Sequence, residues 1–370
     1  MKRWYALPMM AIAGCGLLHS CIEPPLHLPD QQPIVETELE VVIDVDVDLD
    51  SGWYYGWDDK DKEIFGEREF STPSSFQIRR YYTGQEPYAS HTSVLSDEIS
   101  GYIYKSTYQW GYWDLLAWNN ITTLDGVQSL RFDEETSLDY VTASTGQTMN
   151  STRYQTRYTR SFYQPEMLYA AYQKALEISS DLKGFTYDED RGVYVKKLNM
   201  QLQPVTYVYL TQVIIHHNYG RISGVDGNGN LSGMARSVNM NTGVAGSDAI
   251  TVHYYVRFKT GCDKLGENVD IAGGRLLTFG MCDINGCRTK ADEVSDKVHH
   301  YMDVNFQFSK GNDSTLVFDV TDQVRKKPRG GIITIELNAD TIPIPGRKGG
   351  SGFDAVVKDF EDGGTHEFDI

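Results

Sequence analysis

Residues 39–50 alternate between two kinds of side chain, and this pattern constrains the fold more than any other feature of the sequence. Every odd position from Leu39 to Leu49 is aliphatic, and every even position from Asp44 to Asp50 is aspartate. Successive side chains of a strand point to opposite faces, so this repeat predicts a β-strand with one acidic face. An EF-hand calcium loop is not indicated, because Leu49 replaces its glycine and Tyr55 replaces its final acid.

Similar strand-like segments recur along the chain, with glycine-rich turns between them. The chain has 24 Tyr and 34 Gly, and tyrosine and β-branched residues favour half-buried strands. The segments are 76–82, 101–108, 127–132, 138–143, 185–196, 205–216, 221–225, 231–239, 250–258, 275–281, 301–308, 315–320 and 331–337. No repeat typical of a propeller or solenoid is present. The pattern predicts an all-β fold of two antiparallel β-sandwich domains in tandem.

One segment, 161–182, has the spacing of a helix instead. Pro165 and Glu166 stand where a first helical turn favours them, and Gly184 follows as a C-cap. Its apolar positions repeat with a period of about 3.6 residues, which predicts one helix docked on a sheet. The positions that share this face are Met167, Leu168, Ala171, Tyr172, Ala175, Leu176 and Ser179.

The first 21 residues have the order of a lipoprotein export signal. Two basic residues precede an apolar run, Trp4–Leu18, that is too short to span a membrane, and Cys21 follows. After cleavage before Cys21, its thiol would carry diacylglycerol and its new amino group a further acyl chain. Two or more acyl chains anchor a protein stably. Cys15 is the alternative lipidation site, with a shorter apolar run before it. We therefore expect an outer-membrane lipoprotein at the cell surface, with a periplasm-facing protein as the alternative.

The mature chain is long enough for two ordinary domains. The expected organisation is a signal peptide (1–20), a proline-rich tether (21–36), an N-terminal β-sandwich domain with the helix (37–199), a C-terminal β-sandwich domain (200–348) and a glycine-rich, acidic tail (349–370). A domain boundary near residue 243 is the alternative to the one near 200.

Three further cysteines, Cys262, Cys282 and Cys287, allow at most one disulfide bond among themselves. Cys282 could pair with Cys287 across an Asn-Gly turn, and pairing of Cys262 with either one is equally open. No set of four closely spaced ligands indicates zinc. We expect no metal and no cofactor.

No motif in the sequence indicates catalysis. Two pairs of adjacent histidines, 216–217 and 299–300, would point to opposite faces of a strand, so they are expected to be strand-edge or surface residues. The oxygen-rich run 226–230 lacks the glycine and the acid of a calcium loop and is typical of a hairpin turn. Nucleotide-binding and nucleophile-elbow motifs are lacking. With a net charge of −17 and no basic stripe, the chain is not expected to bind nucleic acid.

Two aromatic segments, 53–58 and 108–118, suit either core packing or a sugar-binding platform, because ring faces pack on the C–H faces of sugars. Core or subunit packing is the favoured interpretation. The residues of the alternative platform are Trp53, Tyr55, Trp57, Trp110 and Trp113. Ser314 and Thr341 lie in short patterns that resemble an O-glycosylation sequon of some anaerobic Gram-negative bacteria.

Several motifs resemble an uncharacterised lipoprotein family of gut anaerobes, a domain of unknown function. They are residues 21–28, 53–59, 79–84, 124–130, 231–236, 318–324 and 350–367. More loosely, the lipidated start, the Leu-Ser-Gly-Met-Ala strand and the Asp-Val-Thr-Asp run resemble fimbrillin-like proteins, the type V pilins with their anchor and tip subunits. That resemblance implies transthyretin-like β-sandwiches and assembly in which one subunit adds a strand to the next.

Together these features indicate a lipid-anchored envelope protein that is a structural or adhesive component of a surface fibre or its anchor, without catalysis. A carbohydrate-binding surface lipoprotein with exposed Trp and Tyr platforms is the alternative. The expected partners are the membrane, through acyl chains on Cys21, other fimbrial subunits by strand addition, and glycans.

The lipid anchor is tested by protease treatment of intact cells. We expect the wild-type protein to be degraded, because an anchored surface protein is accessible. This degradation should be lost in Cys21→Ala and kept in Cys15→Ala. Protection of the wild-type protein until the outer membrane is breached would place it in the periplasm instead.

Overall fold

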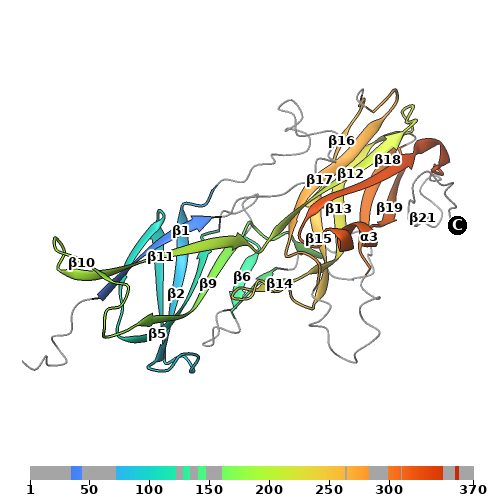
Figure 1. The fold of residues 1–370 in the computed structure, drawn as a ribbon. Coiled ribbons are helices and arrows are strands. Elements are labelled where there is room, and N and C mark those ends of the chain that lie inside the picture. The colour runs from blue at the N-terminus through green and yellow to red at the C-terminus, as the bar shows by residue number, and fades with distance from the viewer. Residues whose placement is uncertain are drawn as a thin grey trace, which may run out of the picture.

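β-strands make up most of the described chain (Figure 1). A computed structural model describes residues 35–43, 72–121, 128–133, 141–146, 161–262, 265–282, 299–309, 311–344 and 355–357. Within these ranges the only α-helix is α3 (Thr321–Lys326), and η4 (Ala339–Thr341) is a 3₁₀ turn. The all-β class is confirmed.

An eight-stranded sheet forms most of the described part of the molecule that precedes residue 205. Its order is β3-β2-β5-β9-β11-β1-β4, with β10 beside β11. The bounds are β1 Val35–Ile43, β2 Ser75–Gly84, β3 Ser93–Ser100, β4 Ile103–Thr107, β5 Gly111–Asn119, β9 Tyr169–Ile178, β10 Thr186–Asp188 and β11 Val193–Pro204. Strands from opposite ends of this order share one buried cluster, to which β2 gives Phe76, β4 gives Tyr104 and β11 gives Leu202. The sheet therefore folds over on itself around this N-terminal core.

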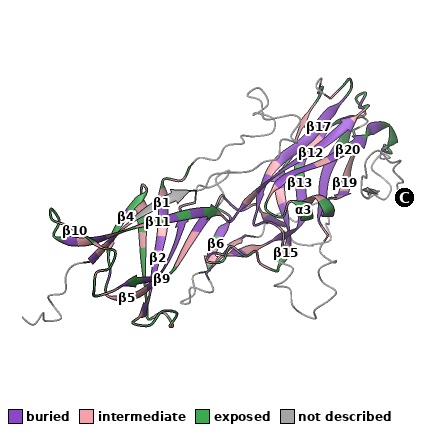
Figure 2. Cartoon of the chain, viewed as in Figure 1, coloured by how far each residue is buried: buried purple, intermediate pink, exposed green. Residues whose placement is uncertain are grey.

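Two further sheets enclose a second, C-terminal core. One has the order β16-β17-β12-β20, and the other β21-β19-β18-β13-β15-β8. The bounds are β8 Ser161–Tyr163, β12 Tyr207–His216, β13 Ile222–Ala235, β15 Ala249–Tyr255, β16 Arg257–Lys259, β17 Asp270–Thr278, β18 Tyr301–Phe308, β19 Asp313–Asp319, β20 Gly331–Asn338 and β21 Ala355–Val357. Tyr209 and Leu276 from the first sheet pack with Phe306 from the second. Figure 2 shows buried residues along both sheets.

The two cores lie end to end and are joined by shared strands (Figure 1). A three-stranded sheet combines β6 (Leu130–Asp133) and β7 (Thr142–Thr145) with β14 (Ser237–Asn239). In the other direction, β8 pairs in parallel with β15 of the C-terminal core. A third buried cluster, with Trp118, Leu168 and Phe279 among its members, fills the junction.

The sheets are mixed, so the expectation of purely antiparallel sandwiches is wrong. Four pairs of described strands are parallel: β1 with β11, β12 with β20, β15 with β8, and β19 with β21. The sequence pattern reports which residues face a core, but strand direction depends on connections between distant segments.

The helix predicted for residues 161–182 is also wrong, because this segment contains β8 and β9. Both faces of β9 are buried at its start: Tyr169 packs in the N-terminal core, and Leu168 and Ala170 pack in the junction cluster. Burial on two faces removes the alternation by which a strand is recognised in a sequence. Gly184, expected as a helix cap, lies in the turn before β10 with φ of +80°.

A bulge in β9 is a second reason why the sequence of this strand has the spacing of a helix. The register between β5 and β9 shifts on either side of Asp114, and Ala175 takes a left-handed conformation with φ of +52°. Its N–H donates to Asp114 Oδ1 at 2.7 Å, which stabilises the bulge. The one extra residue moves the core-facing positions from odd-numbered Tyr169 to even-numbered Leu176 and Ile178, so the two-residue period is broken.

Several other predicted strands are confirmed. Segments 76–82, 205–216, 301–308 and 331–337 correspond to β2, β12, β18 and β20, and 185–196 forms the β10–β11 hairpin. β1 contains the start of the alternating segment, whereas residues 44–50 lie outside the described ranges. β3 and β5 were not predicted.

Glu166 is buried at 1% exposure and connects the segment before β9 to the start of β6. Its carboxylate accepts hydrogen bonds from the Ser129 N–H, the Ser129 hydroxyl and the Leu130 N–H. Glu166→Ala would leave these donors without a partner, so we expect unfolding to become easier by about 3 kcal/mol. Urea denaturation followed by tryptophan fluorescence measures this loss. The matched control Glu177→Ala, at an exposed position of β9, should change stability by less than about 0.5 kcal/mol, and equal effects of the two variants would contradict the assignment.

Candidate functional site

Several residues singled out in the sequence lie outside the described ranges, so their roles stay predictions. They are Cys15, Cys21, Trp53, Tyr55, Trp57 and Cys287.

Trp113 is a core residue. It is 2% exposed, its ring lies 5.0 Å from that of Tyr108 in an edge-on arrangement, and its indole N–H donates to the Gln109 carbonyl at 3.0 Å. Trp110 packs partly buried against the same core. In the described part of segment 108–118, packing is therefore the role of these tryptophans.

The two described cysteines lie at opposite ends of β17. The Cys262 N–H donates to the Val269 carbonyl just before the strand, whereas Cys282 packs in the junction cluster beyond its other end. The nine residues of β17 span roughly 30 Å, far more than a disulfide bridges. The fold thus separates Cys262 from Cys282, and a Cys282–Cys287 bond stays a prediction.

The histidine pairs differ in their surroundings. His216 and His217 end β12 at the surface, with His216 Nε2 lying 3.5 Å from a carboxylate oxygen of Glu336. His300, in contrast, is fully buried, and its Nδ1 lies 3.2 Å from the Ser232 carbonyl. The surface position expected for His300 is wrong, because the chain turns inward before β18.

The run 226–230 is not a hairpin turn but an irregular part of β13. The pairing of β13 with β18 shifts between Val225 and Gly229, and Gly227 has φ of +89°. A Cβ atom at Gly229 would overlap Val256 and Tyr254. The glycines therefore allow a bulge and a close approach to β15 and to Val256, which follows it, rather than a reversal of the chain.

A row of buried polar side chains crosses the sheet beside this bulge. Asn230 donates from Nδ2 to Asp303 Oδ2 at 2.8 Å, and its Oδ1 lies 3.3 Å from His253 Nδ1. Burial raises the pKa of Asp303 to about 7 and lowers the pKa of His253. Among the described residues no group of three His, Cys, Asp or Glu side chains could hold a metal ion, and we assign this row to structure.

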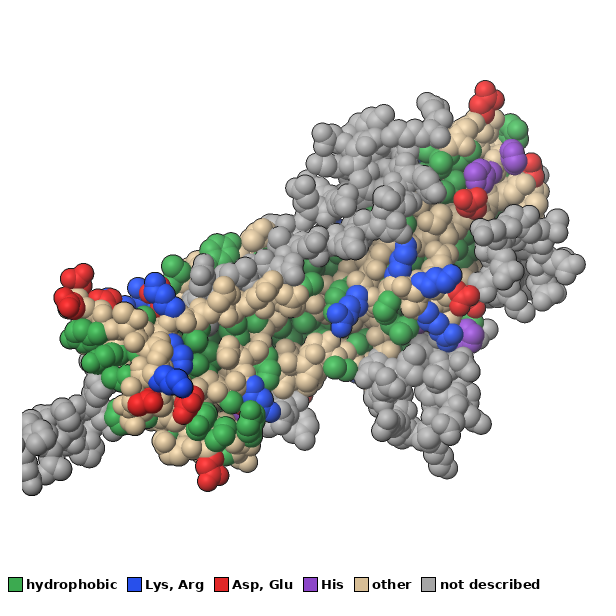
Figure 3. Space-filling model, in the orientation of Figure 1, with side chains coloured by type: hydrophobic (Ala, Val, Ile, Leu, Met, Phe, Trp, Pro, Cys, Tyr) green, Lys and Arg blue, Asp and Glu red, His purple; other side chains and the backbone are tan. Residues whose placement is uncertain are grey.

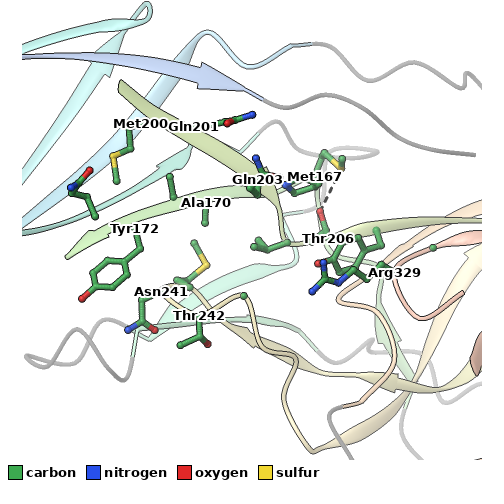
Figure 4. Close-up of a pocket in the computed structure, with 18 of the residues that line it drawn as sticks. Met167, Ala170, Tyr172, Met200, Gln201, Gln203, Thr206, Asn241, Thr242 and Arg329 are labelled. Carbon is green, nitrogen blue, oxygen red and sulfur yellow. Dashed lines mark hydrogen bonds between the residues drawn. The ribbon is translucent and has the colours of Figure 1, made fainter. Parts of the chain in front are cut away.

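A groove of about 590 Å³ lies between the two cores and is here called the junction groove (Figure 4). β9, β11, the segment between β11 and β12, the turn after β14 and the loop before β20 supply its described lining. Its volume is in the range that holds small organic ligands. It is therefore the candidate functional site.

β9 and β11 create the groove by separating. They pair only at Ala170–Gln203 and Tyr169–Pro204. Beyond these pairs β9 stays with β5, and β11 stays with β1. The side chains of Asn199, Gln201 and Gln203 lie at alternate positions of β11 and hence on one face. All three are exposed and line the groove, which gives a row of three amides.

A preorganised turn forms the opposite wall. Asn239 Oδ1 accepts hydrogen bonds from the N–H groups of Asn241 and Thr242, at 3.1 and 3.0 Å, and the Gly243 N–H donates to the Asn239 carbonyl. The side chain of Asn241 takes no part in this closure. Its Oδ1 is buried and has no hydrogen-bond partner among the described residues, which is costly in the free protein.

The two ends of the groove differ in charge, because one is lined by neutral side chains and the other includes a guanidinium group. Figure 4 shows Tyr172 and Asn241 at one end and Thr206 and Arg329 at the other. Burial raises the pKa of Tyr207, and the nearby positive charge of Arg329 opposes this shift. The described lining includes no carboxylate, imidazole or thiol. The groove can therefore bind through hydrogen bonds and ring contacts.

Sequence reasoning missed this site. The alternation Asn199-x-Gln201-x-Gln203 was visible and could have indicated an amide face, but the residues facing it come from positions 40 to 130 residues away.

The structure describes both residues of the glycosylation pattern. Ser314 is half-buried on β19, and Thr341 is exposed in η4, where its hydroxyl donates to the Asn338 carbonyl at 2.8 Å. Modification of either stays a prediction. None of the helices in the described ranges is long and apolar enough to cross a membrane.

No protein-family model matches the chain, and no curated protein sequence matches it. Solved structures do resemble it. A candidate adhesin from Bacteroides ovatus has 15% identity and a TM-score of 0.49, with 85% of this chain and 96% of that chain covered. A candidate polysaccharide-binding protein from Bacteroides thetaiotaomicron has 8% identity and a TM-score of 0.40, with 82% and 90% covered.

The fimbrial anchor protein Mfa2 from Porphyromonas gingivalis has 10% identity and a TM-score of 0.33, with 82% of this chain and 90% of that chain covered. These neighbours resemble the chain at low sequence identity and low TM-score. At such identities and scores they do not establish what this chain binds.

The buried titratable groups predict two opposite dependences of stability on pH. Asp303 has a pKa of about 7 in the folded protein against 3.8 as its usual value. The folded state therefore binds the extra proton, and this contribution to stability is lost as the pH rises from about 4 to about 7. Burial lowers the pKa of His300 from 6.5 to about 4, so its contribution is lost as the pH falls across that interval.

Asp303→Asn separates the two contributions, because asparagine keeps the oxygen that accepts from Asn230 and carries no charge. Between pH 4.5 and pH 8, we expect the free energy of unfolding of the variant to rise by more than about 1 kcal/mol relative to that of the wild type. Urea midpoints at the two pH values measure the gain. Asp340→Asn, at an exposed position of η4, is the control, and the same pH dependence in both variants would contradict the assignment.

Proposed function

We propose that this protein is a lipid-anchored, non-catalytic component of the cell envelope that forms part of a surface fibre or its anchor. The proposal combines the lipoprotein signal ending at Cys21 with a fold whose sheets have open edges. Its end-to-end cores give an elongated shape (Figure 1), which suits a part in a fibre.

The observation that carries the proposal is the weak pairing of β21. This strand has three residues and lies parallel to β19, with Leu316–Ala355, Val317–Val356 and Phe318–Val357 as its register pairs. β19 has seven residues, and β21 is the last strand on that side of the six-stranded sheet. A short parallel strand at a sheet edge is held by few main-chain hydrogen bonds. We infer that it can be displaced by a strand from another subunit.

The lack of catalysis is supported by the chemistry of the junction groove. A hydrolase or transferase needs convergent titratable groups with tuned pKa values. Among the described carboxylates and histidines, the strongly shifted groups are Asp303 and His300, which lie in the C-terminal part of the molecule and not among the groove's lining residues. An adhesive or structural role needs no such groups.

Strand exchange at β19 is tested with a labelled peptide of residues 349–370. In the full-length protein, proline at positions 355, 356 and 357 removes the main-chain donors of β21, so β19 should become available. We expect the peptide to bind this variant at least about tenfold more tightly than the wild type, whose own β21 competes. Fluorescence anisotropy measures the affinity.

A peptide carrying the same three prolines is the matched control. It keeps the charge and length of the labelled peptide but cannot form the ladder, so it should not bind. Equal binding of both peptides, or equal affinity for wild type and variant, would contradict strand exchange.

A further inference from the structure

We propose that the junction groove binds a short glycan. The inference rests on the lining of the groove and not on strand exchange at β19, so failure of one leaves the other standing. The site is distinct from the tryptophan platforms considered from the sequence, and it uses amide and tyrosine side chains.

The ligand class follows first from the hydrogen-bonding groups. A sugar hydroxyl both donates and accepts, and so does a side-chain amide. Five amide side chains line the groove: Gln173, Asn199, Gln201, Gln203 and Asn241. Three of them stand at alternate positions of β11, so they can contact successive hydroxyls along an extended saccharide. The hydroxyls of Thr206 and Thr242, which also line the groove, are already engaged with Leu168 and Asn239, so the amides carry the ligand contacts.

Ring surfaces complete this chemistry. Tyr172 and Tyr207 both line the groove, and Tyr172 lies near Asn241 in Figure 4. A tyrosine ring offers a flat apolar face to the C–H groups of a sugar, and its hydroxyl offers a polar contact. The amide side chains can therefore bind the hydroxyls of a pyranose, and a tyrosine ring can pack on its C–H face.

Asn241 provides a separate sign of a ligand. Its Oδ1 is buried without a hydrogen-bond donor, although the turn around it is closed by Asn239. A buried acceptor without a partner destabilises the free protein. Rotation of the Asn241 side chain into the groove would let a ligand hydroxyl supply this donor, so the energy lost in the free state is recovered on binding.

The charges favour a glycan over a peptide. The described lining carries one charged residue, Arg329, and no acid, so a basic peptide finds no counter-charge. On the face shown in Figure 3, acidic side chains gather at the two ends of the molecule and not over its middle. An added peptide strand would also require alternating apolar pockets, whereas this row on β11 presents amides. Arg329 predicts that an acidic sugar is preferred over its neutral counterpart.

The test is an array of oligosaccharides that includes neutral, N-acetylated and uronic-acid-containing glycans, probed with the purified mature protein. We expect binding to a subset, and calorimetry with the best binder should show at least about a tenfold loss for Gln201→Ala and for Asn241→Ala. Gln307→Ala, at an exposed position of β18, is the matched control and should bind as the wild type does. Arg329→Gln should abolish any preference for acidic sugars.

Thermal unfolding separates a binding role from a structural one. Asn241→Ala removes a buried acceptor that has no partner, so its melting temperature should equal or exceed that of the wild type while affinity falls. Absence of binding to every glycan on the array overturns the proposal. So does unchanged affinity in both groove variants, or a loss of affinity that accompanies a lower melting temperature in each of them.

Discussion

The short contact between β9 and β11 determines the form of the part of the molecule that precedes β12. These strands share only two register pairs, and Pro204 at the end of β11 has no N–H with which to extend the ladder. Past that contact the strands diverge into different layers, and the N-terminal core fills the space between the layers. The junction groove is the open side of the same divergence. The divergence of β9 and β11 therefore produces both the N-terminal core and the junction groove.

The connection to the C-terminal core fixes the other walls of the groove. Thr206 lies in the two-residue link between β11 and β12. Its hydroxyl accepts the Leu168 N–H at 2.8 Å, so the start of β9 and the approach to β12 are tied together. Exchange of β8 and β14 between the two parts of the molecule adds main-chain pairing across the junction. A ligand in the groove would thus meet prepositioned side chains, which reduces the entropy lost on binding.

The outcome of the sequence predictions follows from how each strand is buried. β2 and β18 were recognised because each reads as a compact run of strand-forming residues. β9 was not, because it is buried on two faces and contains a bulge, and the good helix formers Ala, Leu, Glu and Lys dominate its sequence. Parallel partners such as β1 and β11 lie about 160 residues apart, so no local pattern reports their direction. The groove is non-local for the same reason: Gln201 faces Asn241 and Arg329 only after both cores have formed.

Hydrogen–deuterium exchange of the intact protein measures whether β21 is a displaceable strand on the edge of β19. Local opening of three register pairs costs little free energy compared with opening β12, which is paired along its length on both sides. We therefore predict that the amides of residues 355–357 and their partners in β19 exchange orders of magnitude faster than those of β12. Equal protection of β21 and β12 would show a fixed strand and would contradict the account.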